Sequence, residues 1–205
     1  MRTKDKKSAL QRHVRKVKHC VACPRMIGPV VCAEAAFSPV LIVGQAPGAK
    51  EGQFGKPFAW TAGKTLFRWF EKIGLPEVEL RKKVFIGAVC KCFPGKNPKG
   101  GDRVPDPDEI ENCRYWLERE IEIIAPSLVI AVGKLASRQF VDFEKLTEIV
   151  GTIFEIKRAE VAFDLICLPH PSGASTWHRM PPGNALLDQA LKLIAMHPVW
   201  QKVRG

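Results

Sequence analysis

The sequence lacks long apolar runs. None approaches the roughly 20 residues that cross a bilayer, and the basic amino-terminal segment has no apolar stretch typical of a signal peptide. We therefore expect a cytoplasmic protein without a membrane partner, although positive charge alone would also suit a membrane surface. Low-complexity tracts and internal repeats are absent too. With 205 residues and 46% apolar content, the chain is expected to form one domain over residues 1–205 with a full hydrophobic core.

Two common nucleotide-binding signatures are also missing. The sequence contains no GxGxxG motif. Gly63-Lys64-Thr65 resembles the end of a P-loop, but the glycine required upstream would fall at Phe58. These absences disfavour a nucleoside triphosphate as the ligand.

Acidic residues are scarce relative to basic ones. The chain has 32 Lys and Arg against 21 Asp and Glu, a formal net charge of +11. Such a surplus indicates a polyanionic partner such as a nucleic acid, because Lys and Arg neutralise phosphates. Residues 1–19 are especially basic and are expected to form a loose arm, which either stays solvated or contacts nucleic acid.

Short apolar runs alternate with amphipathic ones, which is typical of a parallel sheet flanked by helices. Strands are expected over residues 40–43, 84–89, 128–132 and 163–168, with 150–156 as a candidate edge strand. Helices are expected over residues 64–73, 108–124, 134–140 and 184–196.

Two polar motifs directly follow two of these strands. Gly44-Gln45-Ala46-Pro47-Gly48 comes after the first strand, and His170-Pro171-Ser172-Gly173 comes after the last. The carboxyl ends of parallel strands meet at one sheet edge, where ligands bind in open α/β sheets. We therefore predict that both motifs belong to one site. The Gly-, Pro- and Lys-rich loop 93–107 would lie beside it, and the nearby cations either contact phosphate or only solubilise the loop: Lys91, Lys96, Lys99 and Arg103.

The first motif is suited to binding a planar heterocycle. Its backbone amides can hydrogen-bond the ring, Phe58 can stack on it, and Glu51 can orient water or a ring N–H. The alternatives are that Phe58 fills the core and that Glu51 is an ordinary loop carboxylate.

Seven cysteines need an explanation in a cytoplasmic chain. Cys20 and Cys23 have the two-residue spacing of metal ligands, and Cys92 and Cys113 could complete a set of four. Four thiolates suit zinc or a [4Fe-4S] cluster, and buried free thiols or a redox pair are the alternatives. Cys90 competes with Cys92 as third ligand, and Cys92 is preferred at the loop entrance. The two others, Cys32 and Cys167, are interpreted as core residues.

In combination, these motifs resemble the uracil-DNA glycosylase superfamily, particularly its iron–sulfur branches called families four and five. The resemblance rests on residues 44–48, 55–58 and 62–63, on the four cysteines, on residues 105–110 leading to Cys113-Arg114, and on His170-Pro171-Ser172. It implies an αβα sandwich around four parallel strands. It also implies a structural [4Fe-4S] cluster held by Cys20, Cys23, Cys92 and Cys113, in preference to zinc, and hydrolysis of the bond between a damaged base and deoxyribose in DNA.

The resemblance further implies roles for individual residues. His170 would face the base O2, amides around Gln45 and Ala46 would assist, Phe58 would stack, and Glu51 would position or deprotonate water. A loop over residues 172–182 would press on the DNA. In it, Ser172 and Ser175 would bind phosphate, Trp177, Arg179 or Met180 would fill the gap left by the flipped base, and Arg179 is also a candidate DNA contact.

Three positions depart from the family pattern. Family four usually has Glu where Gln45 stands and an Asn that reads the uracil edge where Ala88 stands, and family one has a water-activating Asp in place of Ala46. Loss of the Asn amide should weaken rejection of other bases. We therefore expect a monomeric glycosylase that acts on uracil, with hypoxanthine and xanthine as further candidates.

Two other classes of function stay open at this point. The first is a DNA-binding module of the same fold that does not turn over, or that traps the sugar covalently. The second, indicated only by charge and cysteines, is another α/β enzyme or a metal-bound structural protein on an RNA-associated complex.

Overall fold

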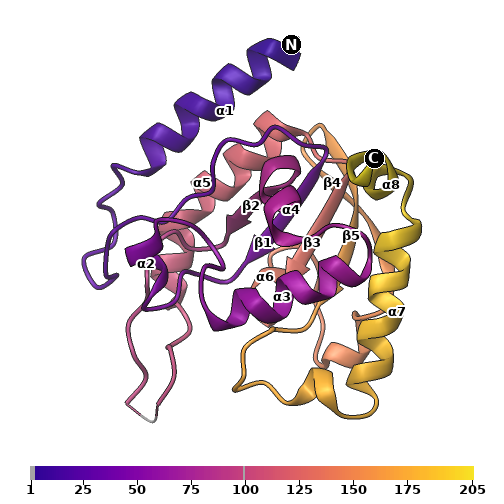
Figure 1. Ribbon diagram of the computed structural model, residues 1–205. Helices are drawn as coiled ribbons and strands as arrows, with labels where there is room; N and C mark the ends of the chain where they lie inside the picture. Colours follow the sequence, from indigo (N-terminus) through magenta and orange to yellow (C-terminus); the bar gives the residue numbers. More distant parts are fainter. Residues whose placement is uncertain (1–2, 99) are drawn as a thin grey trace.

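The computed structural model describes residues 3–98 and 100–205. Arg2 of the predicted arm and Lys99 of the basic loop lie outside the described residues. The fold is an α/β sandwich with a central sheet between helices (Figure 1). No helix among the described residues is long and apolar enough to cross a membrane.

The sheet has five strands in the order β2-β1-β3-β5-β4. Four of them are parallel, as predicted: β1 (Val40–Gly44), β2 (Phe85–Ala88), β3 (Leu128–Val132) and β5 (Val161–Leu168). The fifth, β4 (Ile153–Arg158), pairs antiparallel with β5 at the edge. This strand overlaps the candidate edge strand 150–156, and with it the sheet has one strand more than the four that the family resemblance implies. The side chains of β4 alternate between exposed and half-buried, as expected for an edge strand, whereas every residue of β1 and β3 is buried.

Helices cover both faces of the sheet. In Figure 1, α3 (Thr61–Lys72), α4 (Glu77–Lys83), α7 (Gly183–Met196) and α8 (Pro198–Arg204) lie in front, and α5 (Pro107–Ile124) lies behind. Trp200 of α8 stacks on Phe70 of α3 with ring centroids 5.4 Å apart. Besides α1 (Thr3–Val17), the remaining helical segments are short, namely α2 (Glu51–Phe54), α6 (Lys134–Ser137) and the 3-10 turns Leu146–Glu148 and Trp177–Arg179.

The amino-terminal segment is a helix, so the prediction of a loose arm was wrong. Helix α1 (Thr3–Val17) packs against α5 through Leu10, Val14 and Val17, which are all buried. These side chains recur at the spacing of one helix face. Its basic residues lie mainly on the opposite side, including exposed Arg12, Arg15 and Lys16.

Helix α5 begins where its sequence predicts. Asp106 and Glu109 form a capping box, and Pro107 occupies the first turn, where its missing N–H costs nothing. This fixes the end of loop 93–107. That loop and residues 169–182 both project from the lower side of the molecule in Figure 1, where the parallel strands end.

Candidate active site at the carboxyl edge of the sheet

Strands β1 and β2 end together, and their following loops stay joined. Gly44 is in register with Ala88. Beyond it, the Val89 N–H donates to the Gly44 carbonyl at 2.9 Å, and the Cys90 N–H donates to the Gln45 carbonyl at 3.0 Å. The predicted base-binding residues Gln45 and Ala88 therefore lie together where β1 and β2 end, and Ala46 beside them is half-buried.

The Phe58 ring lies against the end of β1. A Cβ added to Gly44 would meet Phe58 Cζ at 2.7 Å, so this close approach requires glycine. Residues paired in register on neighbouring strands project to the same face. The methyl group of Ala88 therefore points to the face that carries the Phe58 ring.

The backbone of Phe58 is held in an uncommon conformation with φ of 53°. The Arg81 guanidinium of α4 donates to the carbonyls of Pro57 at 2.9 Å and Phe58 at 3.1 Å. Gly63 of α3 approaches so closely that a Cβ there would lie 1.7 Å from the Phe58 carbonyl oxygen. These contacts fix the segment that positions the ring.

Glu51 joins the glycine turn to Phe58. Its side chain is 7% exposed, and its carboxylate accepts hydrogen bonds from the backbone N–H groups of Gly48 and Phe58. Burial raises the pKa of Glu51 to about 7, because the two amide donors only partly offset the loss of water around the charge. A carboxyl group that titrates there can accept a proton near neutral pH.

His170 follows β5 and packs against the loop after β3. A Cβ on Gly133, whose φ is 90°, would lie 3.1 Å from His170 Cδ2. The Ser172 N–H donates to His170 Nδ1 at 3.3 Å, which assigns the proton of the neutral ring to Nε2. Burial lowers the pKa of His170, although the charge of Asp102 opposes the shift, so the neutral ring is favoured.

Asp102, in the loop between β2 and α5, links the two predicted motifs. A Cβ on Gly48 would meet Asp102 Oδ2 at 3.2 Å. Its negative charge also acts to raise the pKa of both Glu51 and His170. Sequence reasoning missed this residue. The available signal was that Asp102 is the sole acidic residue between Phe93 and Val104.

The loop after His170 divides into packed and exposed parts. Ser172 and Ser175 are half-buried and joined by a backbone hydrogen bond of 3.1 Å from Ser175 N–H to the Ser172 carbonyl. Trp177 packs against Gly183, where an added Cβ would lie 2.7 Å from its ring. Arg179 and Met180 are exposed, Met180 by 60%.

The cations near the basic loop are mostly engaged in ion pairs. Lys91 is 3% exposed and pairs with Glu120 at 2.7 Å, so the prediction of a surface cation at this position was wrong. Arg103 pairs with Glu109 at 2.6 Å, and Lys96 pairs with Asp102 at 2.6 Å. Both pairs fix the loop beside the strand ends.

The four predicted cluster ligands line one cavity of about 570 Å³. Cys20 and Cys23 come from the segment after α1, Cys92 from the loop after β2, and Cys113 from α5. Trp116 Nε1 donates to Cys20 Sγ at 3.3 Å. Across the described residues, no three His, Cys, Asp or Glu side chains are grouped closely enough to hold a single metal ion.

The other cysteines are placed differently. Cys90 is fully buried, and its thiol donates to the Glu109 carbonyl at 3.7 Å and contacts Cys113. Cys32 and Cys167 are buried in the hydrophobic core. Cys32 also lines a groove between α1 and α4.

A matching family model and three similar proteins all bear the name uracil-DNA glycosylase. The Uracil DNA glycosylase superfamily model matches residues 33–195. A "Type-4 uracil-DNA glycosylase" of Archaeoglobus fulgidus is 33% identical over 139 residues, which is 65% of this chain and 65% of that relative. A "Type-4 uracil-DNA glycosylase" of Pyrobaculum aerophilum is 32% identical over 164 residues, 76% of this chain and 79% of the relative. A "Type-5 uracil-DNA glycosylase" of the same organism is 30% identical over 156 residues, 61% of this chain and 66% of the relative.

The match to the Archaeoglobus relative thus spans just under two thirds of that protein's length. The family model, in contrast, extends from the segment before β1 into α7 and so includes all five strands, the glycine turn and His170. The chain belongs to the uracil-DNA glycosylase superfamily.

Proposed function

We propose that this protein is a DNA repair glycosylase that takes uracil out of the DNA stack and hydrolyses its N-glycosidic bond, leaving an abasic site. The observation that carries the proposal is the convergence at one sheet edge of a fixed aromatic ring, Phe58, and a neutral histidine, His170. The names of the type-4 and type-5 relatives support the substrate.

In the proposed mechanism, His170 stabilises the leaving base. Cleavage of the glycosidic bond places negative charge on the base and positive charge on the sugar. A proton donor at a base carbonyl therefore acts most strongly in the transition state. With Nδ1 accepting from the Ser172 N–H, the Nε2 proton is the one available for base O2.

Glu51 would activate or position the water that attacks the sugar. With a pKa of about 7, its carboxylate can take a proton from that water or hold it in place. Its hydrogen bonds to Gly48 and Phe58 give it a second role, because they hold the turn and the stacking ring together. The amides of Gln45 and Ala46 would contact the base.

The proposal includes DNA contacts and a cofactor. Ser172, Ser175 and Arg179 would bind phosphate, and exposed Met180 is the residue best placed to fill the gap left by the base. Four thiols around one cavity fit a [4Fe-4S] cluster, which would tie the segment after α1 to Cys92 and Cys113. A cytoplasmic monomer of one domain is part of the same proposal.

The test uses purified protein and oligonucleotides that carry one uracil, hypoxanthine or xanthine. Cleavage by alkali detects the abasic site. We expect product from uracil, and we expect His170→Ala to slow excision at least about hundredfold, as loss of a transition-state donor does, with little effect on DNA binding. Lys192→Ala, on an exposed position of α7, should match the parent protein. Absence of product from every substrate, or a gel-stable protein–DNA adduct instead of free base, would contradict the proposal.

A further inference from the structure

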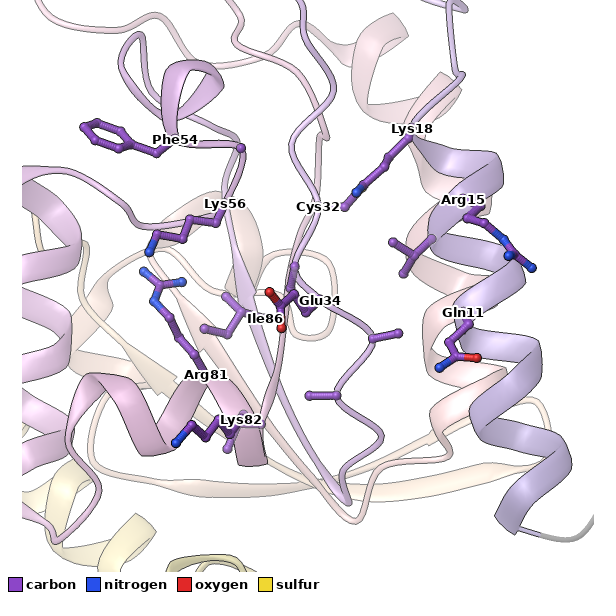
Figure 2. Close-up of a pocket in the computed structure, with 16 residues that line it drawn as sticks. Gln11, Arg15, Lys18, Cys32, Glu34, Phe54, Lys56, Arg81, Lys82 and Ile86 are labelled. Atoms are coloured by element: carbon purple, nitrogen blue, oxygen red, sulfur yellow. The ribbon is translucent and has the colours of Figure 1, made fainter.

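A groove of about 880 Å³ runs along the outer edge of β2, between α1 and α4. Figure 2 shows Arg15 of α1 and Lys18, which directly follows this helix, on one side and Lys56, Arg81 and Lys82 on the other. Residues 32–36 and the β2 residue Ile86 form part of the lining between them. The mechanism proposed above does not use this groove.

The groove has an excess of positive charge. Arg81 and Lys82 are paired with Glu77 and Glu79 on their own helix. Arg15, Lys18 and Lys56 are exposed and have no acidic partner within 4.0 Å among the described residues. The sole acidic residue in the lining is Glu34, which lies between the two sides in Figure 2. An anionic ligand is therefore favoured.

A stacked aromatic pair stands at one end of the groove. Phe54 lines the groove and stacks on Trp60, with ring centroids 5.8 Å apart and an interplanar angle of 21°. The two side chains are 49% and 44% exposed. The Lys64 ammonium lies 5.9 Å from the Trp60 ring centroid. Exposed aromatic faces beside a cationic groove are the combination that binds single-stranded nucleic acid.

The groove and the candidate active site share a wall. Lys56 lines the groove and is two residues from Phe58. Arg81 also lines the groove, and its guanidinium donates to the carbonyls of Pro57 and Phe58. A DNA strand whose base lies against Phe58 would therefore have the groove directly beside it.

We propose that the groove binds an unpaired stretch of the strand that carries the excised base. A base of that stretch would stack on the Phe54–Trp60 pair, and Arg15, Lys18 and Lys56 would contact its phosphates. The faces of bases inside a duplex are covered by their neighbours, so the exposed rings favour an unpaired strand. An acidic peptide suits the rings less well, because the face of an aromatic ring is negative. The inference rests on the proposed function and specifies its substrate as DNA with single-stranded character.

The test measures binding by fluorescence anisotropy, with a labelled uracil-free oligothymidylate about 15 nucleotides long and a matched uracil-free duplex. We expect Phe54→Ala/Trp60→Ala to weaken single-strand binding about tenfold, in the range of one lost base stack. Duplex binding should be nearly unchanged. Tyr115→Ala removes an exposed aromatic ring from α5 and should have no effect.

A second set of variants tests the cationic side of the groove that includes Arg15 and Lys18. Arg15→Ala/Lys18→Ala should weaken single-strand binding more than Arg12→Ala/Lys16→Ala, which removes the same charge from α1 at positions outside the groove lining. Circular dichroism checks that each variant is folded.

Several results would overturn the inference. They are unchanged single-strand binding in both groove variants, equal losses on single strand and duplex, and displacement of the DNA by poly-glutamate at a matched charge concentration. Because the probes lack uracil, these results are independent of catalysis. Failure to excise uracil from any substrate would instead overturn the proposed function, and the binding data would still decide what the groove binds.

Discussion

At the residue scale, the chemistry of the candidate site depends on two titratable groups, the buried Glu51 and the half-buried His170. Burial raises the pKa of Glu51 and lowers that of His170, and both shifts favour the neutral forms. The two groups therefore carry less charge at neutral pH than they would in water, and the carboxylate of Asp102 is paired with Lys96. This reduced charge suits the proposed binding of an uncharged base.

The raised pKa of Glu51 predicts a pH-dependent effect on stability. The folded state holds this proton up to about pH 7, whereas the unfolded chain releases it near the ordinary value. The stabilising contribution of the protonated carboxyl is therefore complete below about pH 4.5 and is lost as the pH rises through about 7. Between pH 4.5 and pH 8, the free energy of unfolding of Glu51→Gln should therefore rise by up to about 3 kcal/mol relative to that of the parent protein.

Urea denaturation of the parent and of Glu51→Gln across that pH range measures the difference. Other titrating groups are common to both proteins and cancel. A constant difference in the free energy of unfolding would show that Glu51 titrates normally in the folded state.

Ala88 offers a test of base selectivity. Its methyl group shares a face with Phe58 at the paired ends of β1 and β2. Ala88→Asn would add one donor and one acceptor there, and we expect preference for uracil over hypoxanthine to rise about tenfold, which corresponds to about one hydrogen bond. Ala88→Leu adds comparable bulk without hydrogen-bonding atoms and should lower excision of both bases. Equal selectivity in the Asn and Leu variants would contradict this role for position 88.

At the scale of elements, the strands were predictable and several contacts between elements were not. The β-branched runs 40–43 and 128–132 predicted buried strands, and the motifs after β1 and β5 lie where the parallel order requires. In α1, Leu10, Val14 and Val17 have helical spacing, but the charged residues around them concealed it. The sequence gives no indication that Lys91 pairs with Glu120, because that contact depends on how α5 packs on the sheet.

Other differences between the predicted and the observed elements lie at the ends of helices. The sequence predicted that α7 ends before Pro198, which it does, but it did not predict the new helix that begins there. His197 caps α8 by accepting from the Val199 N–H at 3.2 Å, and Pro198 occupies the first turn. The Arg81 contact to Phe58 was missed for the same kind of reason, because α4 was not predicted.

The contact between Trp116 and Cys20 joins α5 to the proposed cluster. Trp116→Phe keeps most of the packing against His13 but loses the N–H donor to Cys20 Sγ. With the cluster bound, we expect a chelator to bleach its visible absorbance about fivefold faster, because one lost hydrogen bond is worth about 1 kcal/mol. Tyr115→Phe, at the exposed neighbouring position, is the control. Identical bleaching rates for Trp116→Phe and the parent would contradict the role.

At the scale of the whole molecule, a buried ion pair connects the sheet edge to the helices α5 and α1. Lys91 Nζ donates to the Ala88 carbonyl at 2.9 Å and to Glu120 of α5 at 2.7 Å. Glu120 also lies 3.8 Å from His13 of α1. The pair thus links the Ala88 end of β2 with α5 and α1, and both side chains are 3% exposed.

This burial predicts a strongly non-additive pair of substitutions. Lys91→Met leaves the Glu120 carboxylate without its main partner, and Glu120→Leu leaves the ammonium without its own, so each should lower the free energy of unfolding by about 3 to 5 kcal/mol. The double variant leaves neither charge buried and should recover most of that loss. The measurement is urea denaturation at matched iron content, because Lys91 adjoins Cys92. Losses that simply add would mean that water reaches the isolated charges, and that the three elements are held together by apolar packing alone.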